Sequence, residues 1–269
     1  MPEGPEIFLA ARAVHAAVAN QSAKLELRYP PLAVEARALR GVPITRVHAR
    51  SKAMLTEFAN GVVLYSHNQL YGEWVVHKAG EPLWAKQIRL IITTQNHQTV
   101  LYSATDFAWL TAGSEAQHPY IAKLGPEVLS PQVTALHIAQ RLAAFPRRVI
   151  ADALLDQHVL AGLGNYLRAD ILLAARVHPF CKIGMLSPAQ LLRIGKLSKT
   201  LTQRSVQRAG VVRPWAQYKA ACKAGADYEG ARFYAFDRQG KPCWECAAPI
   251  VRVAQGGRGL FYCPQCQAL

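Results

Sequence analysis

The amino-acid sequence predicts an α+β multidomain protein, because stretches of different patterning follow one another along its 269 residues. An alanine-rich segment that favours a helix comes first, and short alternating runs that favour antiparallel strands follow it. The second half is helical in character and ends in two Cys-x-x-Cys pairs. A chain of this length can bury one large core or two medium ones.

The N-terminal segment "EGPEIFLAARAVHAAVA" (3–19) predicts a helix. Ile7, Ala11 and Val14 recur at helical spacing on one stripe, and Pro5 falls in the first turn, where proline is tolerated. Taken alone, this start is a structural feature in which acidic residues complement the helix dipole.

The segment from about 24 to 110 predicts an antiparallel sandwich or barrel, because many short strands follow one another at close spacing. Turn residues such as Asn60-Gly61 and Gly80 separate them. The runs are "LELRY", "ITRVHA", "AMLTEF", "VVLYSH", "EWVVHK", "IRLIITT" and "TVLYSA".

The rest of the chain divides by composition. Residues 113–131 have weak periodicity and several Gly and Pro, which predicts a linker. Helical runs begin after Gln132, and Ser187-Pro188 predicts an N-cap followed by proline at the first helical position. We expect a connecting loop over 211–231. The predicted domains are 1–112, the linker 113–131, a helical domain 132–231 and a cysteine-containing domain 232–269.

The charge balance favours an anionic partner. Lys and Arg number 31 and Asp and Glu number 17, which gives a net charge of +14. Nucleic acid and anionic membrane both attract such a protein, but the chain has no basic amphipathic helix or lipidation motif, so nucleic acid is favoured. It has no apolar run of roughly 20 residues and no signal-peptide layout, so we expect a soluble intracellular protein.

The strongest local motif is the pair "CWEC" (Cys243, Cys246) and "CPQC" (Cys263, Cys266), with sixteen residues between them. This spacing is typical of a four-cysteine zinc ribbon, and a closed all-sulfur site indicates a structural metal. Disulfides are the alternative, but nothing indicates secretion. Zinc is favoured over disulfides.

Two glycine-rich turns are candidate anion sites. "QGGRGLFY" places Arg258 at a hairpin tip, where a guanidinium can contact phosphate, although a solvated Arg on an ordinary turn is the alternative. "DQHVLAGLGNYLRAD" places Gly162 and Gly164 before a helix that begins near Asn165. Such a turn exposes backbone N–H groups, although a simple helix–helix turn also fits.

The loop "SHNQLYGEW" between two predicted strands contains Gln69, Leu70 and Tyr71. An apolar side chain beside an aromatic ring can enter a base stack and fill the space of a displaced base. Packing of Leu70 and Tyr71 into the core is the alternative, and by sequence alone it is preferred. Lys52 begins a strand after a basic cluster, but a single lysine is usually solvated.

These motifs together resemble the family of formamidopyrimidine-DNA glycosylases and endonuclease VIII. "MPEGPE", "AGLGNYLRAD" and "GGRGLFYCPQC" occur in the order of that family over essentially the whole chain. "PEGPEI" and "YSHNQLYG" resemble the bacterial endonuclease VIII branch. The resemblance implies an N-terminal helix on a two-sheet antiparallel β-sandwich, a helix–two-turn–helix domain and a zinc ribbon. It also implies a bifunctional DNA glycosylase and abasic-site lyase that removes oxidised pyrimidines in base excision repair.

The resemblance also assigns roles to single residues. Pro2, once Met1 is removed, is the amine nucleophile, and Glu3 is the acid/base partner. Lys52 matches the lysine of β-elimination, and Arg258 matches the arginine of phosphate binding and δ-elimination. The implied DNA contacts are Gln69, Leu70, Tyr71, Lys123, Gly164 and Asn165.

The chemistry of an N-terminal proline suits these roles. An α-amino group titrates near roughly 7.7–8.0, so a useful fraction is neutral in the cell. Its position at a helix N-terminus, beside cations, further disfavours the protonated form. A secondary amine that condenses to an iminium acts as an electron sink, which allows elimination of the two flanking phosphates.

Two features depart from the family pattern. Asp170 stands where the family usually has Glu, and residues 211–231, with Trp215 and Tyr218, match no motif. Two other functions remain as alternatives, a purine-directed glycosylase and a non-catalytic DNA-binding protein. The loop "NQLY" argues against the first, and the Pro2-Glu3 terminus argues against the second. We expect a cytoplasmic, nucleoid-associated monomer whose partner is duplex DNA with oxidised bases or abasic sites.

Overall fold

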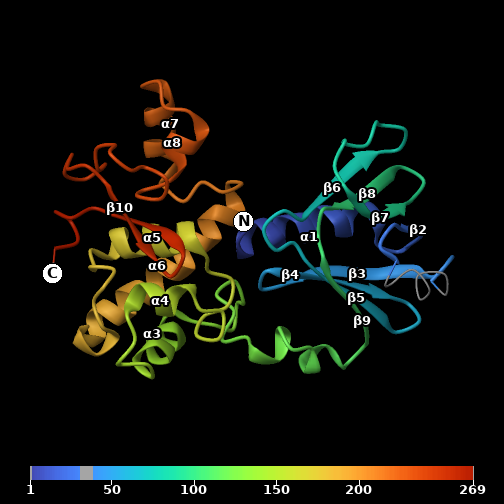
Figure 1. Cartoon of the computed structure of the whole chain (residues 1–269), viewed down its shortest axis with the longest axis horizontal. Helices are drawn as coiled ribbons and strands as arrows, with labels where there is room; N and C mark the ends of the chain where they lie inside the picture. The colour runs from blue at the N-terminus through green and yellow to red at the C-terminus, as the bar shows by residue number, and fades with distance from the viewer. Residues whose placement is uncertain (1, 31–38, 269) are drawn as a thin grey trace. The chain divides into compact units, whose positions relative to one another are not determined.

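The computed structural model describes residues 2–30 and 39–268, which fold as two compact units with limits at 1–123 and 124–269 (Figure 1). The first unit is a helix with two β-sheets, and the second is a set of helices with a small hairpin. The finer limits predicted from the sequence, at residues 112, 131 and 231, remain predictions. Met1 lies outside the described residues.

The first helix is α1 (Gly4–Val18), and it confirms the helix predicted from the alanine-rich segment. Glu3 is the N-cap in an extended conformation, and Pro5 occupies the first turn. The side chains of Ile7, Ala11 and Val14 are buried, as their spacing predicts. Two contacts fix the helix on the sheets: Val47 donates its N–H to His15 Nδ1 at 3.1 Å, and Thr94 Oγ1 donates to the Ala17 carbonyl at 3.3 Å.

Two antiparallel sheets confirm the predicted sandwich. One has the strand order β1-β3-β4-β5-β9, and the other has the order β2-β7-β8-β6. Every predicted run forms a strand, and the structure adds β1 and β9. The strands are β1 (Gln21–Ser22), β2 (Lys24–Leu27), β3 (Pro43–Arg50), β4 (Ala53–Phe58), β5 (Val62–His67), β6 (Glu73–Lys78), β7 (Ile88–Thr93), β8 (His97–Tyr102) and β9 (Asp106–Thr111).

The core of the first unit joins α1 to both sheets. Val18 of α1, Leu64 of β5 and Leu101 of β8 belong to one buried cluster. Burial of each such side chain stabilises the fold by about 1.5–3 kcal/mol. Two short 3₁₀ turns, η2 (Glu115–Gln117) and η3 (Ile121–Lys123), close this unit.

The second unit is built on the helices that the sequence predicts. Ser187 caps α6 and accepts a hydrogen bond from the Gln190 N–H at 3.2 Å, with Pro188 as the first helical residue. The elements are α3 (Ala135–Ala143), α4 (Ile150–Leu155), α5 (Asn165–Ala175), η4 (Ile183–Met185), α6 (Pro188–Gln207), α7 (Trp215–Lys223), α8 (Tyr228–Arg232) and the hairpin β10 (Val251–Gln255) and β11 (Arg258–Tyr262).

The prediction of a loop over residues 211–231 is wrong, because this segment contains the helix α7 and most of α8. Trp215 and Tyr218 stack one turn apart with ring centroids at 4.9 Å, and Asp227 caps α8 by accepting from the Gly230 N–H at 2.8 Å. Ala221 is the one residue of α7 that is buried. A helix without an apolar stripe gives no periodic signal, so the sequence pattern did not reveal it.

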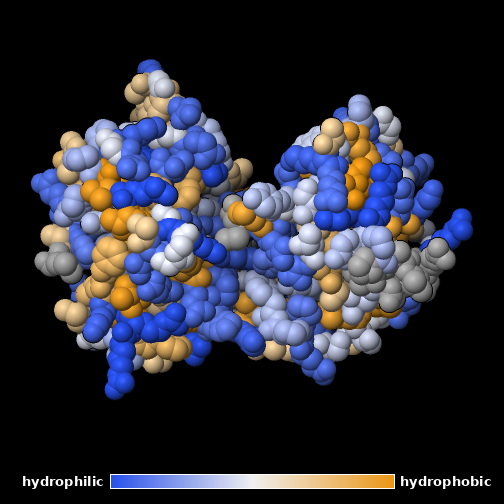
Figure 2. All heavy atoms as spheres, viewed as in Figure 1, coloured by the Kyte–Doolittle hydropathy of each residue, from blue (hydrophilic) through white to orange (hydrophobic). Residues whose placement is uncertain are grey.

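Hydrophilic residues dominate the face of the molecule drawn in Figure 2, and hydrophobic residues reach the surface in smaller patches. Across residues 2–30 and 39–268, no helix has both the length and the apolar character that crossing a membrane requires.

Candidate functional site

The beginning of the chain is held in place by the first turn of α1. The Glu3 N–H donates to Glu6 Oε2 at 2.9 Å, and the Ile7 N–H donates to the Glu3 carbonyl at 3.1 Å. Pro2 is half-buried, and Glu3 is buried with 2% of its surface exposed. Glu6 therefore fixes the peptide group that follows Pro2, and the first residues form an ordered helix start.

A pocket of about 370 Å³ opens beside this terminus. Pro2 and Glu6 form one wall, and Leu70 and Tyr71 form part of the other. The structure thus brings the predicted nucleophile and the predicted wedge to one pocket. The complete lining is Pro2, Glu6, Ile7, Ala10, Asn68, Leu70, Tyr71, Gly72, Glu73 and Trp74.

The loop between β5 and β6 presents Leu70 and Tyr71 to solvent, with 57% and 78% of their surfaces exposed. The alternative in which these two side chains pack into the core is therefore wrong. Gly72 closes the loop through its N–H, which donates to the Asn68 carbonyl at 2.7 Å. A Cβ at position 72 would lie 2.5 Å from that carbonyl oxygen, so only glycine fits the turn.

Gln69 adopts a left-handed backbone conformation, with φ 52°. Its N–H donates to His67 Nδ1 at 2.9 Å, and its side-chain oxygen accepts from Thr105 Oγ1 at 2.7 Å. Burial lowers the pKa of His67, and the charge of Lys52 lowers it further, while Asp106 opposes the shift. The lowered pKa favours the neutral imidazole near pH 7, and the hydrogen bond that Nδ1 accepts from Gln69 places the ring proton on Nε2.

Lys52 lies in the hairpin between β3 and β4 and is 6% exposed, so it is not solvated as a single lysine usually is. Its backbone N–H donates to the Tyr120 hydroxyl at 3.4 Å, and that hydroxyl donates to Ser51 Oγ at 3.4 Å. The Tyr120 ring lies 5.1 Å from the ring of His67. The Lys52 hairpin and the Gln69 loop are thus connected through Tyr120 and His67. Lys123 is exposed at the end of η3.

In the second unit, the glycine turn before α5 is held by one glutamine. The Gly162 N–H donates to Gln157 Oε1 at 3.0 Å, and Gln157 Nε2 donates to the Leu163 carbonyl at 2.8 Å. Gly162 has φ +98°, and Gly164 is the extended N-cap of α5. The turn therefore ends at a helix N-terminus, where backbone dipoles favour an anion.

Asn165 connects this turn to the C-terminal hairpin. Its Nδ2 donates to the Gly259 carbonyl at 2.9 Å, and its Oδ1 accepts from the Arg168 guanidinium. Gly259 follows Arg258, which is exposed at the start of β11. The structure thus brings three residues of the second unit that the resemblance assigns to DNA or phosphate contact close together, namely Gly164, Asn165 and Arg258.

The hairpin that carries Arg258 turns through Gly256 and Gly257, whose φ angles of 55° and 73° are both positive. Such angles at the two central residues are typical of a tight hairpin turn. Gln255 Nε2 donates to Asp152 Oδ1 at 3.0 Å and anchors the hairpin to α4. Arg258 therefore projects from a hairpin turn that a hydrogen bond holds against α4.

Asp170 is fully buried, and its carboxylate accepts three backbone N–H groups. Tyr234 donates at 2.8 Å, Ala235 at 2.8 Å and Phe236 at 3.0 Å. Burial raises the pKa of Asp170 to about 6, against the lowering effect of these hydrogen bonds. The shorter side chain therefore does reach a partner, and it joins α5 to the segment that leads into the C-terminal cysteines.

The sulfur atoms of Cys243, Cys246, Cys263 and Cys266 all lie within 4.8 Å of one another. The Cys243–Cys266 and Cys246–Cys263 sulfurs are 3.9 and 3.4 Å apart. A tetrahedral zinc with Zn–S distances of about 2.3 Å needs sulfurs roughly 3.8 Å apart, so the four residues fit this metal. The cluster is a closed structural zinc site.

Sequence patterns did not reveal two residues that hydrogen-bond the candidate residues Lys52 and Asn165. Tyr120 comes from the segment interpreted as a linker, and it holds the Lys52 hairpin although 68 residues separate the two. The Gly259 carbonyl bonds Asn165 across 94 residues. No local pattern reports such contacts, since neither residue type is unusual at its position.

Comparison with known protein families matches three segments of the chain. Residues 1–106 match the formamidopyrimidine-DNA glycosylase N-terminal domain, and residues 124–213 match the formamidopyrimidine-DNA glycosylase H2TH domain. Residues 240–269 match the zinc finger found in FPG and IleRS.

Full-length relatives and solved structures agree with these matches. Endonuclease 8 of Pectobacterium atrosepticum is 36% identical over 100% of both chains. Endonuclease 8 of Escherichia coli is 37% identical over 99% of this chain and 100% of its own. The Lactococcus lactis formamidopyrimidine-DNA glycosylase, bound non-covalently to DNA with an AP site, aligns with a TM-score of 0.82 at 20% identity over 100% of both chains. Its complex with DNA containing N7-benzyl-Fapy-dG aligns at 0.83 and 21%.

Proposed function

Because the chain belongs to the formamidopyrimidine-DNA glycosylase and endonuclease VIII family, we propose that it removes oxidised pyrimidines from duplex DNA through an N-terminal proline nucleophile. It is a DNA glycosylase with AP lyase activity in base excision repair. The observation that carries the finer proposal is the pocket that Pro2 shares with Leu70 and Tyr71. A damaged base must leave the duplex before its sugar can react, and a wedge beside the nucleophile suits that step.

The first chemical step forms a covalent bond between Pro2 and the damaged sugar. Removal of Met1 makes the Pro2 nitrogen a secondary amine, which attacks the anomeric carbon as the bond to the base breaks. The base departs with the electron pair of that bond and takes up a proton, and the sugar ring opens to an iminium. Glu3 is the acid/base group for these proton transfers, and its buried position beside Pro2 supports this role.

The second step breaks the strand. The iminium makes the neighbouring C–H acidic, so loss of that proton expels the 3′ phosphate, and a second elimination expels the 5′ phosphate. Lys52 serves the first elimination and Arg258 serves the second. The low exposure of Lys52 and the supported turn of Arg258 are compatible with fixed positions for both charges.

The remaining predicted residues bind the DNA around the lesion. Gln69 and Lys123 contact it from the first unit, and Gly164 and Asn165 contact phosphate at the start of α5. Leu70 and Tyr71 fill the space that the extruded base leaves. We propose that the protein acts as a monomer on nucleoid DNA. The zinc holds the ribbon and takes no part in the reaction.

Two alternatives differ in testable ways. A purine-directed glycosylase would act on oxidised purines through the same covalent bond, and the loop "NQLY" favours pyrimidines instead. A non-catalytic DNA-binding protein would form no covalent bond, and it has no need of a Pro2 amine held at an ordered helix start.

Borohydride trapping tests the mechanism. The protein is incubated with duplexes that carry thymine glycol, an oxidised purine or an abasic site, and the iminium is then reduced to a stable cross-link. We expect cross-links with thymine glycol and abasic DNA, and none with Pro2→Gly or with protein that retains Met1. Absence of any cross-link with the processed wild type contradicts the nucleophile, and a preference for the purine duplex contradicts the pyrimidine assignment.

A further inference from the structure

A groove of about 530 Å³ lies between α3 and α6 in the second unit, outside the residues assigned to DNA repair. Ten of its eleven lining residues are Ala, Leu, Ile, Pro or Gly, and Gln140 is the exception. Leu136, which lines it, is 54% exposed, and Met185 beside it is 72% exposed. Large apolar side chains at a surface are commonly sites of association.

The groove is preformed, because the backbones of the two helices that form its walls are in direct contact. A Cβ at Gly195 of α6 would lie 2.2 Å from the Ala135 carbonyl oxygen of α3, so the two helices are already in contact. The short side chains of Ala143, Gly184 and Ala189 leave the hollow open. A preformed apolar site binds with little reorganisation cost.

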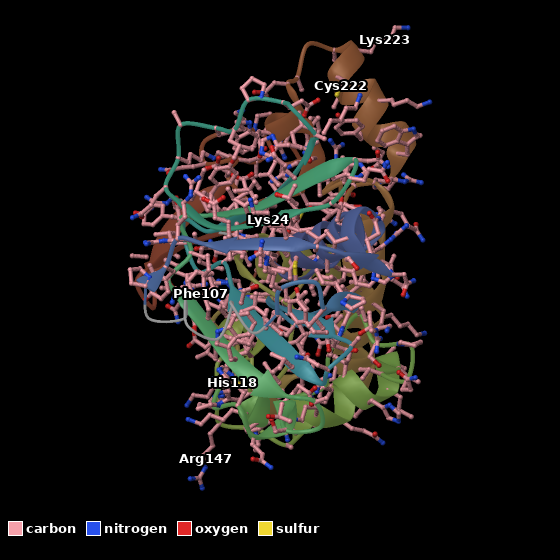
Figure 3. The ribbon with its side chains drawn as sticks, turned by 90° about the vertical axis from the view of Figure 1, so that its right-hand side faces the viewer. Lys24, Phe107, His118, Arg147, Cys222 and Lys223 are labelled. Atoms are coloured by element: carbon pink, nitrogen blue, oxygen red, sulfur yellow. The ribbon has the colours of Figure 1, made fainter. Side chains whose placement is uncertain are left out.

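The two segments that supply the walls of the groove contain cations and no carboxylates, and the Asp156 carboxylate at the Arg147 end is already paired with Arg148 at 2.7 Å. Residues 128–151 and 171–226, which supply both walls, include neither Asp nor Glu. Arg147 and Lys182 lie at the same end, because the Ile183 N–H donates to the Arg148 carbonyl at 2.9 Å and the Gly184 N–H donates to the Pro146 carbonyl at 2.9 Å. Both cations are exposed, and Figure 3 shows Arg147 pointing away from the ribbon.

We propose that this groove docks a short acidic segment of a partner protein, with bulky apolar side chains in the groove and flanking carboxylates near Arg147 and Lys182. The apolar lining disfavours a DNA backbone, which needs hydrogen-bond donors to its phosphates. The net charge of +14 disfavours a second copy of this chain. An acidic peptide with bulky apolar residues fits both the apolar lining and the two cations, Arg147 and Lys182, at the end of the groove.

Fluorescence anisotropy tests the proposal with the full-length, zinc-loaded protein. The probe is a fluorescein-labelled peptide that carries Leu and Phe between Asp residues, and its control has Ser in place of Leu and Phe. We expect the Leu/Phe peptide to bind at least about tenfold more tightly than the Ser peptide. The charge-reversed pair Arg147→Glu and Lys182→Glu should weaken binding by a similar factor.

Leu136→Asp should abolish most of the binding, since it puts a charge in the groove. The substitution is placed in the first turn of α3, where an acidic residue is compatible with the helix dipole, so the fold should persist. Lys223→Glu, on exposed α7 of the same unit, is the matched charge control and should bind as wild type.

Three results would overturn the proposal. The first is that the Leu/Phe and Ser peptides bind equally, or that neither binds. The second is that undamaged duplex DNA competes with the peptide and Leu136→Asp weakens DNA binding, and the third is that sedimentation shows a dimer that Leu136→Asp dissociates. Cleavage of abasic DNA by Leu136→Asp should match wild type, so failure of this docking site is distinguishable from failure of the proposed repair function.

Discussion

The Asn165 side chain donates a hydrogen bond to the Gly259 carbonyl at 2.9 Å and so joins the N-terminus of α5 to the hairpin that carries Arg258. The glycine turn before α5 and the hairpin of the zinc ribbon are far apart in the sequence, yet the Asn165 side chain fixes the position of one against the other. The same side chain accepts from Arg168, which fixes its orientation. Asn165, which we expect to contact DNA, therefore also helps to position Arg258, for which a phosphate contact is proposed.

Asn165→Ala should weaken binding to an abasic-site analogue duplex by roughly 3- to 10-fold, because it removes one hydrogen bond worth about 0.5–1.5 kcal/mol and loosens the Arg258 turn. Titration at fixed salt measures the effect. Asn96→Ala, at the turn between β7 and β8, is the control and should bind as wild type. Unchanged binding by Asn165→Ala would show that the hairpin is positioned by other contacts.

Leu70→Ala and Tyr71→Ala should each reduce excision of thymine glycol by about tenfold or more, since the wedge must hold the duplex open. Both side chains are exposed, so thermal stability should stay within about 0.5 kcal/mol of wild type. Tyr71→Phe keeps the ring and should retain most of the activity. A drop in stability that matches the drop in activity would instead indicate a packing role.

Asp170 should make the protein more stable as the pH falls from 7.5 to 5. Its pKa in the folded state is about 6, above the ordinary value of 3.8, so the folded protein binds more protons than the unfolded chain. The stabilising contribution is complete below pH 3.8 and is lost as the pH rises through about 6. Over this range the gain is of order 1 kcal/mol.

Denaturant unfolding at several pH values checks the Asp170 prediction. Asp170→Asn should be less stable by about 1–3 kcal/mol, because its NH₂ group faces backbone donors, and it should lack this pH dependence. Asp237→Asn is the matched control at an exposed position, and it should keep the wild-type profile. Equal pH profiles for wild type and Asp170→Asn would contradict the raised pKa.

Cys246→Ser should release the zinc and unfold the ribbon, since a closed four-sulfur site stabilises such small domains directly. Trp244 reports the change by its fluorescence, because its ring lies 3.8 Å from the Arg213 guanidinium and 4.0 Å from that of Arg238. DNA binding should fall with the metal content. Cys222→Ser, outside the cluster, should keep one zinc per chain, and full DNA binding by metal-free protein would contradict the structural role.

Local sequence patterns by themselves determined most of the secondary structure of this protein and its metal site. The apolar stripe of α1, the alternating strands and the Ser187 cap were predictable because each depends on neighbours within a few residues. The paired cysteines likewise indicated a zinc site by spacing alone, and the structure brings their sulfurs together. The helix α7 was not predictable, since it lacks a buried stripe.

Only the tertiary structure decided how the candidate residues are held. Lys52 is buried and Leu70 is exposed, the reverse of what each residue type favours. Asp170 meets residues 234–236, and Asn165 meets Gly259, across separations of 64 to 94 residues. Sequence periodicity reports which face of an element is buried, but the partner of a side chain depends on how distant elements pack, which no local pattern contains.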